Sequence, residues 1–224
     1  MLPPGKLPPG VAAYTDRVLS FYDWWVLGFS NRFIWQCPTR RLLAIYDEHA
    51  SDNHLEIGVG SGFFLDRCRF PTAAPRLVLF DANRRCLDWA ARRVARYHPT
   101  TLQGDVLQPI AAGPGFDSVG MNYVLHCLPG RMPGKAAAIR HAASLLNPGG
   151  VLFGATILSG GVPRGTMARR LMAHYNARGI FSNAADTLES LRAALGGCFR
   201  EPRLTSVGCV AIFVGRKGPS EICP

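Results

Sequence analysis

Short apolar runs alternate with longer helical patterns from residue 53 onward, and this alternation limits the fold more than any other feature of the sequence. The expected strands are 54–59, 76–81, 100–105, 116–122, 149–157 and 207–215, with residues 200–206 as a candidate for a seventh. The expected helices are about 61–69, 83–97, 132–146, 163–178 and 184–196. Because strands that alternate with helices form parallel βαβ units, we expect an α/β fold with a doubly wound, mostly parallel, seven-stranded sheet.

The chain is expected to form one main domain with a helical cap on its N-terminal side. Its 224 residues fall within the range of a single domain. Residues 1–10 are rich in proline and glycine and are expected to be a flexible tail, followed by the cap at 11–50. The core is placed at 51–217, with a substrate-side insertion at 160–182, and 218–224 forms a second tail.

Cysteine content favours a cytoplasmic protein, whereas the charge decides nothing by itself. The net charge of +10 is spread over separate arginine pairs, which indicates solvated helix faces more than a nucleic-acid surface. The seven cysteines are odd in number and contain no C-x-x-C, so neither a disulfide framework nor a zinc site is expected. No apolar run approaches the roughly 18 residues of a membrane span. The N-terminus also lacks the apolar region of a secretory signal.

A glycine-rich turn follows the first expected strand, in the segment Glu56-Ile57-Gly58-Val59-Gly60-Ser61-Gly62. Glycines at this place let the backbone turn tightly and approach a ligand closely. A dinucleotide site requires G-x-G-x-x-G, but the third glycine is replaced by Phe63 in one register and by Leu65 in the other. The dinucleotide pattern therefore fails in both registers, and a glycine-rich turn without a ligand is the alternative to a ligand site.

The second expected strand ends in an acid, Asp81, which lies nineteen residues after Gly62. This is close to the spacing at which an acid binds a ribose, and a carboxylate can accept hydrogen bonds from both ribose hydroxyls. The alternative is that Asp81 caps the helix that begins near Asn83.

Together with Gly104-Asp105-Val106, with 116–126 and with the Pro-Gly-Gly turn at 148–150, these motifs resemble those of class I S-adenosylmethionine-dependent methyltransferases over about residues 53–157. The resemblance implies a Rossmann-like core that binds S-adenosylmethionine and releases S-adenosylhomocysteine. It implies that Asp105 contacts the adenine amino group, with a solvated turn aspartate as the alternative. The implied cofactor-binding residues are Glu56, Gly58, Gly60, Ser61, Gly62, Asp81, Ala82, Asn83, Gly104, Asp105, Val106, Asn122 and Tyr123.

Departures from the family patterns limit the classes of molecule that could accept the methyl group. Val124 and Leu125 stand where enzymes that methylate nucleic-acid bases carry prolines, and no acidic cluster follows the fourth strand. We therefore expect neither a nucleic-acid partner nor a metal. The resemblance is closest to small-molecule, ubiquinone-biosynthesis-like and phospholipid-like branches, through the short element Phe21-Tyr22-Asp23. The expected reaction is methylation of O or N, less favourably C, on a small apolar or aromatic molecule, plausibly in secondary metabolism.

Methyl transfer from a sulfonium mainly requires alignment of the acceptor and exclusion of water. His126 is the leading candidate for a general base because it follows the fourth strand, and Tyr22 is a weaker one. The alternative is that His126 satisfies backbone groups of its own loop. The aromatic segment 11–36 is expected to fold over the crevice as a lid, with 163–181 as the opposite wall. The expected substrate-binding residues are Tyr14, Tyr22, Trp25, His126, Met172 and Tyr175.

Three rival functions remain open on these residues. The basic charge and the aromatic segment suit a phospholipid headgroup methyltransferase that associates peripherally with membranes, without stable insertion. A non-catalytic cofactor-binding protein is disfavoured by the intact series of glycines and acids. A nicotinamide-dependent oxidoreductase is disfavoured by Phe63. The oligomeric state is not predicted.

Overall fold

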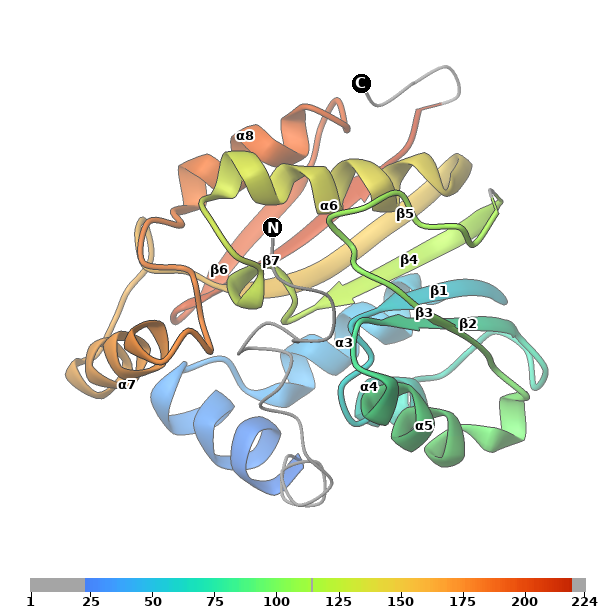
Figure 1. Cartoon of the computed structure of the whole chain (residues 1–224), viewed down its shortest axis with the longest axis horizontal. Coiled ribbons are helices and arrows are strands. Elements are labelled where there is room, and N and C mark those ends of the chain that lie inside the picture. The colour runs from blue at the N-terminus through green and yellow to red at the C-terminus, as the bar shows by residue number, and fades with distance from the viewer. Residues whose placement is uncertain (1–22, 114, 219–224) are drawn as a thin grey trace.

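The computed structural model describes residues 23–113 and 115–218 and contains a seven-stranded sheet between layers of helices (Figure 1). The strands are β1 Asn53–Ile57, β2 Arg76–Asp81, β3 Thr100–Gln103, β4 Phe116–Asn122, β5 Leu146–Ile157, β6 Arg203–Val207 and β7 Val210–Arg216. Their order across the sheet is β3-β2-β1-β4-β5-β7-β6, and only β7 runs antiparallel to its neighbours. The prediction of a doubly wound, mostly parallel sheet is confirmed.

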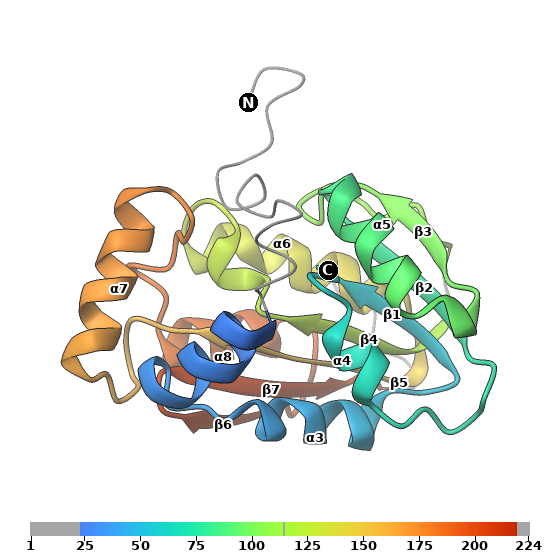
Figure 2. The same ribbon diagram turned by 90° about the horizontal axis from the view of Figure 1, so that it is seen from below.

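Side chains of β2 show how both faces of the sheet are buried. Leu77 and Leu79 pack with the layer of α3 Thr39–His49, α4 Phe63–Arg67 and α5 Arg84–Arg93. Val78 and Phe80 pack with the layer of α6 Met132–Ser144 and α8 Leu188–Gly196. Because successive side chains of a strand point to opposite faces, one apolar run supplies both cores. Figure 2 shows the same elements after a turn of 90° about the horizontal axis of Figure 1.

A third apolar cluster lies at the carboxyl ends of β4 and β5. There the helix η1 Asp23–Ile34, which has π geometry, and α7 Thr166–Ala177 contribute Ile34 and Met172 beside Tyr123 and Ile157. The short 3₁₀ helices η2 Ala95–Tyr97 and η3 Leu125–Cys127 follow α5 and β4. Tyr14 and Tyr22 lie outside the described residues, as does the side chain of Trp25.

Several element bounds differ from the sequence predictions: β1 and β3 end two residues early, and β7 begins at Val210 and not at 207. Strand β5 begins three residues before the expected position 149, because Leu146 pairs with Phe116 ahead of a register shift. Cys198 is disulfide-bonded, which corrects the expectation that no disulfide would form. The other cysteines in the described part of the chain are free, at positions 37, 68, 86, 127 and 209. None of the described helices is long and apolar enough to cross a bilayer.

Candidate active site

The three glycines of the turn after β1 have different structural tasks. All adopt left-handed backbone, with φ of +75°, +51° and +74° at Gly58, Gly60 and Gly62. A Cβ on Gly58 would lie 2.3 Å from Cγ2 of Val124, and one on Gly62 would lie 3.1 Å from Ala90. No atom lies within 4 Å of a Cβ built on Gly60. Gly58 and Gly62 therefore allow Val124 and Ala90 to pack against the turn, whereas Gly60 borders open space.

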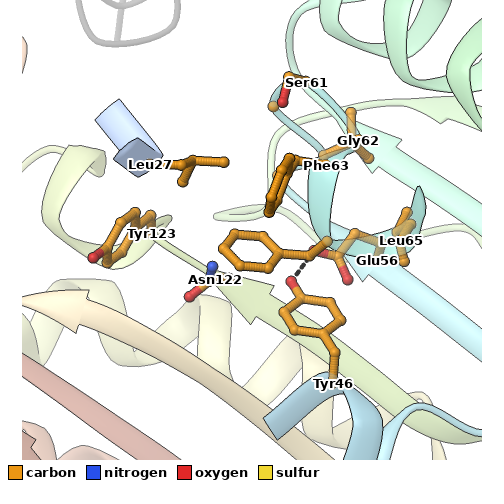
Figure 3. A pocket seen from close by; sticks show the side chains of 13 residues that line it. Leu27, Tyr46, Glu56, Ser61, Gly62, Phe63, Leu65, Asn122 and Tyr123 are labelled. Carbon is orange, nitrogen blue, oxygen red and sulfur yellow. Dashed lines mark hydrogen bonds between the residues drawn. The ribbon is translucent and has the colours of Figure 1, made fainter. Parts of the chain in front are cut away.

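A pocket opens beside this turn, between β1, β4, η1 and α4 (Figure 3). It brings together the predicted residues Glu56, Gly58, Gly60, Ser61, Gly62, Asn122 and Tyr123. The sequence analysis missed the other lining residues, which are Leu27, Tyr46, Val59, Phe63, Phe64 and Leu65. Leu27 and Tyr46 come from the N-terminal helices, and no spacing in the sequence relates them to the glycine turn.

Two oxygen-bearing side chains give the pocket a negative, hydrogen-bond-accepting wall. Glu56 is 3% exposed, and the Tyr46 hydroxyl donates to its Oε1 at 2.6 Å. Oδ1 of Asn122 is buried and accepts no hydrogen bond from the protein. A buried acceptor without a donor costs free energy unless a ligand supplies one. This wall fits a cationic group, such as the ammonium of the S-adenosylmethionine that the sequence resemblance implies.

Tyr123 connects the pocket to the N-terminal helices. It follows β4 directly and has a left-handed backbone, with φ +61°, which is strained for a residue with a side chain. Its hydroxyl donates to Oδ1 of Asn31 in η1 at 2.8 Å, and Asn31 in turn donates to the Thr39 hydroxyl at 3.0 Å. These hydrogen bonds hold the strained residue against the cap.

Asp81 lies at the end of β2, beside the backbone of the glycine turn. The Asn83 N–H donates to its Oδ1 at 2.8 Å. Burial raises the pKa of the Asp81 carboxyl to about 6, against the opposing effect of backbone hydrogen bonds. The side chain of Asn83 caps α5 by accepting from Arg85, and the carbonyl of Ala82 accepts from Gln103. Both neighbours of Asp81 therefore have structural contacts of their own.

The residues after β3 lie outside the lining of this pocket. Asp105 is exposed, and its Oδ1 accepts the Leu107 N–H at 2.9 Å, which is the contact of a turn aspartate. Val106 is buried in the core beneath α6. Gly104 is needed for packing, since a Cβ there would lie 2.8 Å from the ring of Phe80. The adenine contact of Asp105 stays a prediction.

His126 is buried and makes hydrogen bonds within the protein. It is 3% exposed, its Nδ1 accepts the Ile157 N–H at 3.3 Å, and Nδ1 also lies 3.3 Å from the Thr156 hydroxyl. Burial, with the nearby Lys135 ammonium, lowers the pKa of His126 to about 3. The imidazole is therefore neutral near pH 7 and a weak base. These contacts favour the alternative reading, in which it satisfies groups of its own loop.

The helix α7 forms one wall of a second, more open space. A groove of about 510 Å³ separates it from Ile34 of η1, and its α7 side carries Thr166, Met167, Arg170, Leu171 and His174. Of the predicted substrate residues, Met172 is buried behind this wall and Tyr175 packs on Phe181. Ile34 and Leu171 line the groove and belong to the same apolar cluster as Tyr123, which lines the pocket, so the groove and the pocket border one cluster.

The raised pKa of Asp81 predicts that donor binding weakens in acid. Protonation would remove the charge that the sequence analysis predicts to accept the ribose hydroxyls, and it proceeds as the pH falls through about 6. We expect the calorimetric affinity for S-adenosylhomocysteine to fall about tenfold from pH 7 to pH 5. Asp81→Asn, which cannot ionise there, should bind more weakly at both pH values. If the affinity of Asp81→Asn fell from pH 7 to pH 5 by the same factor as that of the unchanged protein, the pH dependence would belong to another group.

Comparison with known proteins agrees with this geometry. A family model described as "Methyltransferase domain" matches residues 55–152. Demethylluteothin O-methyltransferase of Streptomyces thioluteus is 42% identical over 91% of this chain and 89% of its own length. The physcion biosynthesis cluster O-methyltransferase of Aspergillus chevalieri is 38% identical over 95% of this chain and 98% of its own length. The solved DhpI-SAH complex covers 94% of this chain and 96% of its own with a TM-score of 0.67, and at 15% identity it shares the fold alone.

Proposed function

This chain belongs to the class I S-adenosylmethionine-dependent methyltransferases that act on small molecules, and we propose that it methylates a hydroxyl oxygen of an aromatic or conjugated acceptor. The observation that carries the proposal is the pocket lined by the Glu56 carboxylate, by the Asn122 amide with its unpaired oxygen, and by Gly60. The choice of oxygen is supported by the two O-methyltransferases at 42% and 38% identity.

Glu56 and Asn122, which line the pocket, and Asp81, which lies outside its lining, would hold the methyl donor. Glu56 and Asn122 would accept hydrogen bonds from its ammonium, and Asp81 from its ribose hydroxyls. Because Gly60 has no side chain, the methyl donor could approach its backbone closely. When bound, S-adenosylmethionine supplies a methyl group that is already activated by its sulfonium. The chain must then align the acceptor and exclude water.

We place the acceptor in the groove between η1 and α7. Ile34, Met167 and Leu171 offer apolar surface for a planar molecule, while Arg170 and His174 can donate hydrogen bonds to its oxygens. No carboxylate lines the described part of this groove, so an acceptor with an acidic, partly ionised hydroxyl would be attracted there. Such an acceptor needs little help from a general base, which agrees with the low pKa of His126, about 3.

The proposed acceptor is a free metabolite and not a nucleic acid or a membrane lipid. We place the reaction in the cytoplasm, which is supported by the free thiols of Cys37, Cys68 and Cys86.

A methyl-transfer assay with paired acceptors tests the proposal. The protein is incubated with S-adenosylmethionine labelled in its methyl group and with phenols or hydroxypyrones, aromatic amines of the same skeletons, or phosphatidylethanolamine vesicles. We expect label on hydroxyl oxygens only. Arg170→Ala should raise KM about tenfold with kcat unchanged, as expected for a lost charged hydrogen bond.

Arg169→Ala is the matched control for this experiment. Arg169 is the neighbouring arginine, but it donates to the carbonyl of Arg164 at 2.8 Å and does not line the groove. Its replacement should leave KM unchanged. Label found only on amines or only on lipid would contradict the proposed acceptor, and equal effects of the two variants would remove the assignment of the groove.

A further inference from the structure

A chain of polar side chains is buried between β1 and α3, behind the Glu56 wall of the pocket. His54 is fully buried, and its Nε2 lies 3.1 Å from Oε2 of Glu56. Its Nδ1 lies 2.7 Å from the hydroxyl of Ser118, which is also fully buried. The other carboxylate oxygen, Oε1, accepts from Tyr46 at 2.6 Å. Both oxygens of Glu56 are thus held by partners from two different elements, α3 and β1.

Further hydrogen bonds continue this network of side chains from Ser118 to Ser51. Ser51 donates its N–H to Oγ of Ser118 at 2.9 Å and its hydroxyl to the carbonyl of Asn53 at 3.0 Å. Oγ of Ser51 and Oγ of Ser118 also lie 2.8 Å apart, and either can donate. When the Ser118 hydroxyl donates to Nδ1 of His54, the histidine proton is on Nε2, facing Glu56. In this assignment every donor points toward the carboxylate. Two donated hydrogen bonds then fix the orientation of the carboxylate.

Gly120 provides the room in which this carboxylate lies. It is the register partner of Glu56 on β4, and a Cβ there would lie 2.1 Å from Oε2 of Glu56 and 3.2 Å from Cε1 of His54. A Cβ contact below 3 Å requires the neighbour to move. An alanine at this position would therefore displace the carboxylate, from the side opposite to Tyr46.

We propose that Tyr46 and His54 are positioning residues that hold the Glu56 carboxylate toward the cationic end of the methyl donor. The inference rests on the proposed function, because it assigns Glu56 to the donor ammonium. The packed ring of Phe153 keeps the arrangement dry, with its centroid 5.0 Å from that of Tyr46 and 5.7 Å from that of His54. Since Tyr46 lies in α3, part of the N-terminal cap segment completes the donor site.

Two ligands, one with and one without the amino-acid end, distinguish a positioning role of Tyr46 and His54 from a general effect on protein stability. S-adenosylhomocysteine carries an amino-acid end with an ammonium, whereas 5′-methylthioadenosine has the same nucleoside and thioether without it. We expect Tyr46→Phe to lower the calorimetric affinity for S-adenosylhomocysteine about tenfold or more, which is the effect of losing a hydrogen bond to a charged group. The affinity for 5′-methylthioadenosine should change less than about twofold. Gly120→Ala should give the same selective loss.

Tyr97→Phe is the matched control. It removes the same hydroxyl from a tyrosine in η2 that packs on Phe70 and does not line the pocket. Both ligands should bind it as they bind the unchanged protein. If Gly120→Ala does not fold, Tyr46→Phe decides alone.

Equal losses for the two ligands in Tyr46→Phe, or no loss for either, would overturn the positioning role while leaving the proposed function intact. Failure of the unchanged protein to bind S-adenosylhomocysteine would contradict the proposed function itself, and this inference with it.

Discussion

Gly60→Val is expected to abolish binding of S-adenosylhomocysteine while the protein stays folded. Gly60 has φ +51°, and no atom lies within 4 Å of a Cβ placed on it, so valine would project into the open side of the pocket. The left-handed backbone adds strain of about 1–2 kcal/mol for a residue with a side chain. Steric exclusion of the donor is the larger effect, and we expect the affinity to fall at least about hundredfold, some 2.7 kcal/mol.

The chain offers a matched control at Gly130. This glycine is exposed, has φ +84°, also has no atom within 4 Å of a built Cβ, and lies outside the pocket. Gly130→Val should cost similar stability in thermal unfolding and leave the calorimetric affinity unchanged. Gly58→Val should instead lose the fold, because its Cβ would lie 2.3 Å from Val124. Normal donor binding by a folded Gly60→Val protein would contradict the assignment of the glycine turn.

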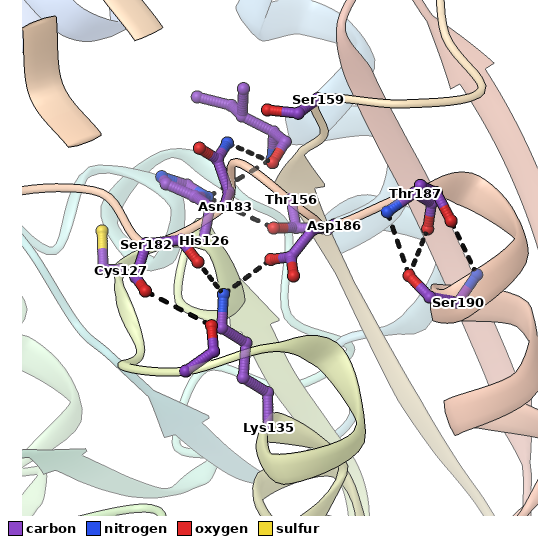
Figure 4. A network of polar contacts seen from close by, with 12 residues as sticks. His126, Cys127, Lys135, Thr156, Ser159, Ser182, Asn183, Asp186, Thr187 and Ser190 are labelled. Carbon is purple, nitrogen blue, oxygen red and sulfur yellow. Dashed lines mark hydrogen bonds and ion pairs between the residues drawn. The ribbon is translucent and has the colours of Figure 1, made fainter. Parts of the chain in front are cut away.

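Lys135→Met is expected to lower the free energy of unfolding by about 3–5 kcal/mol, the range for breaking a buried ion pair. Nζ of Lys135 lies 2.6 Å from Oδ2 of Asp186 and donates to the carbonyl of Ser182 at 2.7 Å (Figure 4). Both side chains are essentially unexposed. Burial lowers the pKa of Lys135 and raises that of Asp186, so each charge depends on the other. Without the lysine, Asp186 keeps a buried charge or takes up a proton.

Urea unfolding of single and double variants measures this dependence. Lys135→Met/Asp186→Leu removes both charges and should recover most of the stability that Lys135→Met loses. The loss should also loosen the loop at Ser182, whose N–H donates to the carbonyl of His126 at 2.8 Å. A single-variant cost below about 1 kcal/mol would mean that the pair behaves as a surface ion pair.

The sequence by itself determined the strands and the glycine turn. The observed bounds of β2 and β4 are the predicted ones. The apolar run of β2 ends at the polar residue Asp81, and β4, whose second and third residues are polar, ends at Asn122. The positive φ angles of Gly58, Gly60 and Gly62 likewise agree with the motif. These features are local: a strand repeats every two residues, and a left-handed turn selects glycine at its own position.

Only the tertiary structure decided which side chains meet. Tyr46 and Glu56 are ten residues apart, yet nothing in their spacing predicts a hydrogen bond, because it depends on how α3 packs across β1. The burial of His126 and its low pKa depend on the loop at Phe181, whose ring lies 4.5 Å away between centroids. The groove depends on the separation of η1 from α7. Contacts between distant segments are set by packing of whole elements, which no short stretch of sequence encodes.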